Sequence, residues 1–516
     1  MTTPSPPTRR HLSAWLLPAG LVVLLTWPMI LSGFVKGRGA FDQLNYHEQV
    51  VRTFAEQLPK PDYSDYLSAT TPGYHTVLAV VARVVSDERW VLQLAGSLFT
   101  VGLFVVLAWG IGWQGSRWHG SPSREEGLLP GRGLLAGDSG LVVLLLPVLV
   151  SMPVFYSGVW MLPDNAGWLG VLAVWLLALR PRFDAVTLIG GGLTLALLVF
   201  VRQIHLWPLA MLLTAAWLGT RTQRERGFDF SQDLRELFSQ IPERLVRTSL
   251  VMLAALPAVA ILLYFWNLWD QTLTPPMFKE RHVGGNPSAP AFVLAVFGMY
   301  AVFFLPYILD GLHRLWVRHT WLLGLAVVLG AAIALAVPTT RETGAGRYSG
   351  LWEIADLLPA PMDRSVLIVP LAVLGSVLVA AWFVVLGRRD RWIMLAAMVA
   401  FTAAQCASFK LWQRYTEPMV LLWLALAAAR VAPARSPAGA SWRVLGPMVL
   451  AVGLALLTAA SLVAARAVEP RNFLAPGEIA APVLPGMIER SREERNRDDA
   501  QLPSDRSRAK KESEHP

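Results

Sequence analysis

Two aspartates of this chain lie beside strongly apolar segments, where a carboxylate is unusual. Asp42 lies in the first polar segment, and Asp164 lies in a short turn between two apolar runs. A carboxylate that faces lipid at the centre of a membrane costs about 3 kcal/mol, so each should face protein, water or a ligand. Either group could act as a general base that takes the proton of a hydroxyl group. The alternative for both is the structural role of a helix N-cap.

The residues after Asp42 predict an amphipathic helix that lies on the membrane surface. Leu44, Val51 and Phe54 recur at helical spacing, as the buried face of such a helix requires. His47 falls on the same face. The predicted helix begins at Asp42, where the helix dipole would keep a carboxylate ionised.

Three arginines stand beside other polar or aromatic residues at the ends of apolar runs. A guanidinium presents a fork that matches two phosphate oxygens, whereas an arginine near a membrane surface can also simply extend its head group to water. We predict a donor-phosphate or sugar site formed by Arg202, Gln203, His205, Arg347, Tyr348, Arg414 and Tyr415. Further candidates on the same side of the membrane are His47, His75, Asp270 and His282.

The composition indicates a membrane protein. Apolar residues make up 54% of the 516 residues, and charged residues make up 16%, against roughly 25% in soluble domains. The net charge of +9 comes from short clusters of Lys and Arg between apolar runs, which is typical of cytosolic loops rather than of nucleic-acid binding. Cys406 is the only cysteine, so no intramolecular disulfide is possible. No spacing typical of a metal site is present, and we predict neither metal nor cofactor.

About thirteen apolar runs are long enough to cross a bilayer, so the predicted fold class is an all-α membrane protein. Residues 1–12 form a cytosolic N-terminus, 13–466 form the membrane domain, and 467–516 form a polar tail expected to be disordered. The outer loops are predicted at 35–88, 270–289 and 338–365.

Two of the apolar runs do not have the length of a single membrane span. The run 183–219 would be about 55 Å long as one helix, so it is predicted to be a hairpin with its apex at Arg202, Gln203 and His205. The run 74–85 is too short to span. If it does not cross, the arginine-rich segments 114–137 and 220–247 fall on the cytosolic side, as the positive-inside rule requires.

The first outer loop carries the strongest resemblance to a known family. Asp42, His47 and the run Thr70-Thr71-Pro72-Gly73 resemble the opening motif of the dolichyl-phosphoglucose α-1,2-glucosyltransferases, a family of GT-C membrane glycosyltransferases. Gln43 departs from the family pattern, because the family has a second carboxylate at this position. The family's paired proline is a single proline, Pro72, in this chain. The weaker similarities are at Val201-Arg202-Gln203, Arg347-Tyr348, Arg414-Tyr415 with Pro418, and around Asp270 and His282.

The resemblance implies a GT-C bundle and an inverting transfer of a hexose, with glucose expected, from a polyprenyl-phosphate sugar. The implied acceptor is a lipid-linked or surface glycan on the non-cytosolic face, and membrane lipid is the other partner. Asp42 would be the base, and Arg202, Arg347 or Arg414 would hold the phosphate. The departures favour a bacterial cytoplasmic membrane over the endoplasmic reticulum. A mannosyl- or aminoarabinosyl-type transferase and a lipid-linked sugar flippase remain alternatives. The sugar, acceptor, linkage and oligomeric state stay open.

Overall fold

The computed structural model describes residues 9–117, 138–220, 228–281, 284–431 and 440–466, and every regular element in these ranges is a helix. The predictions made for the tail 467–516 and for His282 lie outside these ranges. The longer elements, in chain order, are α1 (Arg9–Leu31), α3 (Glu48–Gln57), α4 (Gly73–Val84), α5 (Arg89–Arg117), α6 (Asp138–Val150), α7 (Met152–Val159), α8 (Asp164–Ala178), α9 (Ala185–Val201), α10 (Leu209–Leu218), α11 (Phe230–Leu237), α12 (Ile241–Leu268), α13 (Ala289–Ala301), α14 (Leu305–Arg318), α15 (Thr320–Ala336), α17 (Ile368–Val385), α18 (Arg388–Cys406), α19 (Gln413–Val431) and α20 (Ala440–Arg466).

The helices pack through small residues that let their backbones approach closely. A Cβ atom on Gly375 of α17 would lie 2.0 Å from the carbonyl oxygen of Leu294 in α13, so no larger residue fits there. Gly298 of α13 faces the same contact. Such close approach is typical of helices packed inside a membrane, where dispersion contacts replace the hydrophobic effect. Along α12, large apolar side chains such as Leu253, Leu256 and Leu263 stay exposed, as expected of a surface that faces lipid.

Five of the described helices are long and apolar enough to cross a membrane, by length and composition. They are Arg89–Ile111, Ile241–Leu268, Ala289–Arg318, Pro361–Val385 and Trp442–Arg466. A sixth span results if α7 and α8, which meet at 116°, are counted as one broken crossing. The predicted number of about thirteen is therefore not confirmed.

The difference arises because several apolar runs are broken into shorter helices. Leu16–Leu31, Ala185–Val201, Gln203–Leu218 and Thr320–Ala336 are apolar helices of at most 17 residues. At about 1.5 Å per residue, the longest of these reaches about 25 Å, which is short of a bilayer core. The predicted span 138–157 is interrupted at Ser151, where the backbone is extended between α6 and α7.

The predicted hairpin is confirmed, with its apex at Arg202. The helix α9 ends at Val201, and Arg202 adopts an extended conformation before the short 3₁₀ turn Gln203–Leu206 (η3) and α10. The run 74–85 is also present as the separate twelve-residue helix α4. Gly73 starts this helix tightly against α9, because a Cβ there would lie 2.6 Å from the carbonyl oxygen of Phe200.

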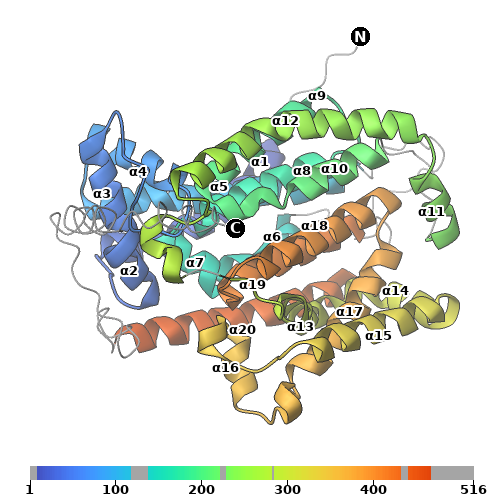
Figure 1. The fold of residues 1–516 in the computed structure, drawn as a ribbon. Helices are drawn as coiled ribbons and strands as arrows, with labels where there is room; N and C mark the ends of the chain where they lie inside the picture. Colours follow the sequence, from blue (N-terminus) through green and yellow to red (C-terminus); the bar gives the residue numbers. More distant parts are fainter. Residues whose placement is uncertain (1–8, 118–137, 221–227, 282–283, 432–439, 467–516) are drawn as a thin grey trace, which may run out of the picture.

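The helix that contains Asp42 begins earlier than predicted. The short helix α2 (Arg38–Asp42) starts after Gly37, whose φ of 89° suits glycine. It continues through the π-helical turn Gln43–His47 (η1) into α3. Asp42 therefore lies one turn inside the helix, and the expectation that it is an N-terminal residue is wrong. Figure 1 shows α2, α3 and α4 together at one end of the molecule, with α11 at the other end.

Candidate functional site

The site is built around two ion pairs that join segments far apart in the sequence. Arg414, in the first turn of α19, donates to Asp42 with 2.8 Å between Nη1 and Oδ2. Arg202, at the apex of the α9–α10 hairpin, pairs with Asp164, the first residue of α8. All four residues were predicted from the sequence, and the structure brings them together in these two pairs.

Tyr415 contacts both arginines. The guanidinium carbon of Arg202 lies 4.7 Å from the centre of the Tyr415 ring, and that of Arg414 lies 4.9 Å from it. Arg414 also donates to the Tyr415 hydroxyl at 2.9 Å. An aromatic face attracts a cation through its quadrupole, so Tyr415 helps to hold both guanidinium groups in the site.

Trp412 adds an aromatic surface to the site, and sequence reasoning missed it. Its ring lies parallel to that of Tyr415, 5.7 Å between centres, and the Arg414 guanidinium lies 4.5 Å from the Trp412 ring centre. Tyr348 packs edge-on against Trp412 at 5.0 Å. Among the described residues, Trp412 Nε1 and Arg414 Nε have no hydrogen-bond partner. The signal in the sequence was the run Trp412-Gln413-Arg414-Tyr415, in which two aromatic residues flank two hydrogen-bonding side chains.

His47 and His75 form a pair beside the two ion pairs. His47 Nδ1 lies 2.9 Å from His75 Nε2, and the two rings stack with centres 5.2 Å apart. Burial lowers the pKa of His47 to about 4, against the opposing effect of the Asp42 and Asp164 charges. Both histidines are therefore neutral at pH 7, because the pKa of His75 is lowered by burial as well.

His205 is buried against the start of α8. Its Nδ1 accepts a hydrogen bond from Trp207 Nε1 at 3.2 Å. Its Nε2 has no partner among the described residues and lies where a Cβ on Gly167 would come within 2.9 Å. Gly167 follows Asp164 by less than one turn, so His205 packs directly behind the Asp164–Arg202 pair.

Two of the predicted site residues make hydrogen bonds to loops. Arg347 is buried, and its guanidinium donates to Glu342 at 2.5 Å and to the Thr340 carbonyl oxygen at 2.8 Å, within its own loop. That Arg347 holds a phosphate stays a prediction, and its guanidinium is here paired with a carboxylate, as that of Arg202 is. Gln203 donates to the carbonyl oxygens of Ala69 and Leu273, at 2.8 Å and 2.7 Å, and so ties two loops together.

The remaining candidates lie elsewhere. Asp270 is exposed at the end of α12, where the chain turns with a φ of 50°. His282 is not among the described residues. Asp270 takes no part in the two ion pairs of the site.

Gln43 points into a buried network. Its Nε2 donates to Glu48 at 3.2 Å, and its Oε1 accepts from Gln93 Nε2 at 3.0 Å and from the Met161 amide at 3.1 Å. An amide can donate and accept at once, whereas a carboxylate could not donate to Glu48. Glutamine therefore suits the local packing of this chain better than a carboxylate would.

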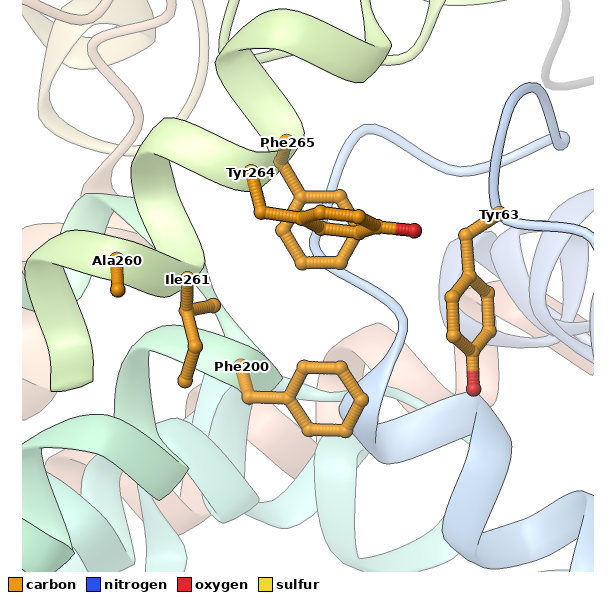
Figure 2. Close-up of a pocket in the computed structure, with 6 residues that line it drawn as sticks. All are labelled: Tyr63, Phe200, Ala260, Ile261, Tyr264 and Phe265. Carbon is orange, nitrogen blue, oxygen red and sulfur yellow. The ribbon is translucent and has the colours of Figure 1, made fainter.

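An apolar pocket of about 420 Å³ lies next to the hairpin apex, between the ends of α9 and α12. Figure 2 shows Tyr63 and Phe200 facing each other across it, with Tyr264 and Phe265 above. Phe200 stands two residues before Arg202 on the same segment. The lining residue Phe200 packs against Phe265 of α12, whereas Arg202 pairs with Asp164 of α8.

No protein-family model, curated protein or solved structure compared with this chain matches it. In the part of the chain that the structure describes, no three His, Cys, Asp or Glu side chains form a group that could hold a metal ion. The site is therefore interpreted from its own geometry.

Proposed function

We propose that this chain is a membrane glycosyltransferase of the GT-C type that transfers a hexose from a polyprenyl-phosphate sugar to a hydroxyl acceptor. The observation that carries the proposal is the pair of arginines, Arg202 and Arg414, which both contact the ring of Tyr415, each with a carboxylate partner. Two guanidinium groups suit a phosphate, and the two carboxylates suit proton removal.

Asp42 is the proposed general base. Its side chain is 20% exposed and that of Arg414 is 30% exposed, so a ligand can reach this pair. The acceptor oxygen bonds to the anomeric carbon, and the bond from that carbon to the phosphate oxygen breaks. The electron pair leaves on the polyprenyl phosphate, and the acceptor proton passes to the Asp42 carboxylate. Arg202 and Arg414 stabilise the charge that grows on the phosphate.

The apolar pocket supports a lipid-linked donor. The pocket between α9 and α12 is lined by apolar and aromatic side chains that suit isoprene units, and its residue Phe200 stands two residues before Arg202. The pocket is open to the outside, so a long chain can leave it into the surrounding lipid.

The position of the charged groups favours an enzyme over a flippase. Asp164 and Arg414 lie in the first turns of their helices, and Arg202 follows the last residue of α9. A transporter would be expected to hold its substrate near the middle of the membrane, at helix breaks reached from both sides. We place the enzyme in a bacterial cytoplasmic membrane, with glucose as the first sugar to test and mannose or aminoarabinose as the alternatives.

The test is donor turnover by purified protein in lipid nanodiscs. Undecaprenyl-phosphate esters of β-glucose, β-mannose, β-galactose and 4-amino-arabinose are supplied one at a time, and release of undecaprenyl phosphate is followed by chromatography. We expect release from one donor, retained in Asp87→Asn, whose carboxylate is exposed, and lost in Asp42→Asn. Absence of release from every donor, with simple glycosides present as acceptors, would contradict the proposal.

A further inference from the structure

The His47–His75 pair has one shared proton position, and its surroundings fix where that proton lies. One of His47 Nδ1 and His75 Nε2 must donate and the other must accept across the 2.9 Å contact. His75 is fully buried, and its other nitrogen, Nδ1, has no partner among the described residues. The two possible arrangements therefore differ in what is left on that buried nitrogen.

The cheaper arrangement leaves a bare lone pair on His75 Nδ1. A neutral imidazole carries one proton, so if His75 accepted at Nε2, its Nδ1 would hold a buried N–H without an acceptor. Buried N–H groups without partners are rarer than acceptors without partners. His75 therefore donates from Nε2, and His47 accepts at Nδ1. It follows that the proton of His47 is on Nε2.

The π-helical turn places this N–H on the same side of the helix as Asp42. Asp42 and His47 are five residues apart, and in an α-helix such residues point about 140° away from each other. The turn η1 (Gln43–His47) instead closes its hydrogen bonds between residues five apart. Asp42 and His47 consequently lie on the same side of the helix, and the Asp42 charge acts on the His47 ring.

His47 is also the member of the pair that a ligand can reach. It is partly exposed, whereas His75 is not. The charged groups that act on its ring come from every neighbouring segment: Asp42, Asp164, Arg202 and Arg414. Its hydrogen bond to His75 uses Nδ1, so Nε2–H remains available to a ligand on the side of the helix that carries Asp42.

We propose that His47 Nε2–H and the Asp42 carboxylate together bind two neighbouring hydroxyl groups of a sugar acceptor. This inference rests on the proposed function and names the acceptor class. Asp42 accepts from the hydroxyl that attacks, and His47 donates to the oxygen of the adjacent hydroxyl. His75 is a positioning residue, since it keeps the His47 proton on Nε2. An acceptor with a single isolated hydroxyl would use only half of this arrangement.

The first test reads the proton directly and needs no turnover. The full chain, labelled with ¹⁵N at its nine histidines, is placed in lipid nanodiscs, and the His47 signals are identified by their loss in His47→Gln. We expect a neutral His47 protonated at Nε2, and a mixture of the two tautomers in His75→Leu. His75→Gln, which keeps a donor, should preserve the Nε2 form and replaces His75→Leu if that variant does not fold. A His47 protonated at Nδ1 in the wild type would overturn the inference.

The second test asks what binds. Methyl β-glucoside, which has neighbouring hydroxyl groups, should shift the His47 Nε2 signal saturably. The matched 2,3,4-trideoxy glycoside should leave it unchanged. Loss of one neutral hydrogen bond should weaken binding about tenfold in His47→Phe, measured by saturation-transfer NMR, while His47→Gln stays within about threefold because it keeps an N–H.

Equal shifts with both glycosides would contradict the paired-hydroxyl site. Both readouts are independent of the donor, so they remain decisive if no sugar transfer is found. A saturable shift without transfer from any donor would contradict the proposed function alone.

Discussion

The two ends of α19 carry the same kind of ion pair in opposite surroundings. Arg414 stands in its first turn and Arg430 in its last, about 24 Å apart along the helix. Arg414 pairs with Asp42, and their side chains are 30% and 20% exposed. Arg430 pairs with Asp390, and each side chain is only 4% exposed.

At the Arg430 end, arginines satisfy the carbonyl groups left open where helices end. Arg430 donates to the Leu179 carbonyl oxygen, and Arg389 donates to those of Ala178 and Gly219, at the ends of α8 and α10. These hydrogen bonds satisfy backbone groups, because the last carbonyls of a helix have no partner within it. The pair at this end holds helices together.

At the Arg414 end, the arginine faces aromatic rings instead of carbonyl groups. Its Nε has no partner in the described part of the chain, and its carboxylate partner is open to exchange with another anion. The comparison teaches that an Arg–Asp pair alone does not identify a site. The exposure of the pair and the kind of group around the guanidinium separate a structural pair from one that can bind a ligand.

The largest expected effect is on stability, at the closed end. Asp390→Ala leaves Arg430 buried without its carboxylate and should lower the free energy of unfolding by about 3–5 kcal/mol. Unfolding in mixed micelles measures this, with Asp310→Ala as control, since the Asp310–Arg314 pair is exposed and should be worth less than about 1 kcal/mol. Equal losses in the two variants would remove the distinction between the ends.

At the open end, Asp42→Asn should remove activity while preserving the fold. Loss of the base should slow transfer about a hundredfold, equivalent to about 2.7 kcal/mol of transition-state stabilisation. Donor binding and the unfolding free energy should stay near wild-type values, because the pair with Arg414 is partly exposed. The transfer rate at saturating donor decides. A rate within threefold of wild type would exclude Asp42 and give the role to Asp164.

Arg202→Ala should weaken donor use by about 2 kcal/mol, which is the scale of a charge-assisted hydrogen bond. Arg202→Lys should recover only part of the loss, since an ammonium group cannot make a bidentate contact with the phosphate. The measurement is kcat/KM for the donor, beside Arg341→Ala, which removes an exposed arginine paired with Asp356. Wild-type kcat/KM in Arg202→Ala would show that this arginine does not bind the donor and only extends its head group to the membrane surface.

The smallest expected effect comes from filling the pocket. Ala260→Trp should raise the KM for an undecaprenyl donor several-fold, and should change the KM for a donor with a two-isoprene chain less, because the ring occupies space that the longer chain needs. Ala254 lies on the same helix against Gly192, so a bulky residue there tests general disturbance of α12 instead. An equal change in KM for both donors in Ala260→Trp would separate the pocket from the site.

The sequence predicted the parts of the site that depend on local breaks in the chain. The hairpin apex at Arg202 follows from a run too long for one helix, and Asp164 follows Pro163, which opens α8. The start of α2 was missed, because it depends on the φ of Gly37, which no apolar pattern reveals. As a result Asp42 was placed at a helix start, although it lies within the helix.

What the sequence could not supply is the choice of partner. Arg347 and Arg414 both precede a tyrosine, yet one turns into its own loop toward Glu342 and the other reaches Asp42, hundreds of residues away. Only tertiary packing separates them. The predicted number of membrane spans was not confirmed for a related reason. Hydropathy does not show where an apolar run such as 138–157 bends.

Gln203 connects the proposed phosphate site to two loops of the chain. One amide group holds the Ala69 and Leu273 carbonyl oxygens and accepts from the Thr71 amide at 3.0 Å, while its neighbour Arg202 faces the proposed phosphate. A donor that steadies Arg202 would also steady Gln203, and with it the contact between two loops that are far apart in the sequence. The amide hydrogens around Thr71 should then exchange with solvent more slowly when the donor is bound, so that ligand binding is recorded as local order in the loops.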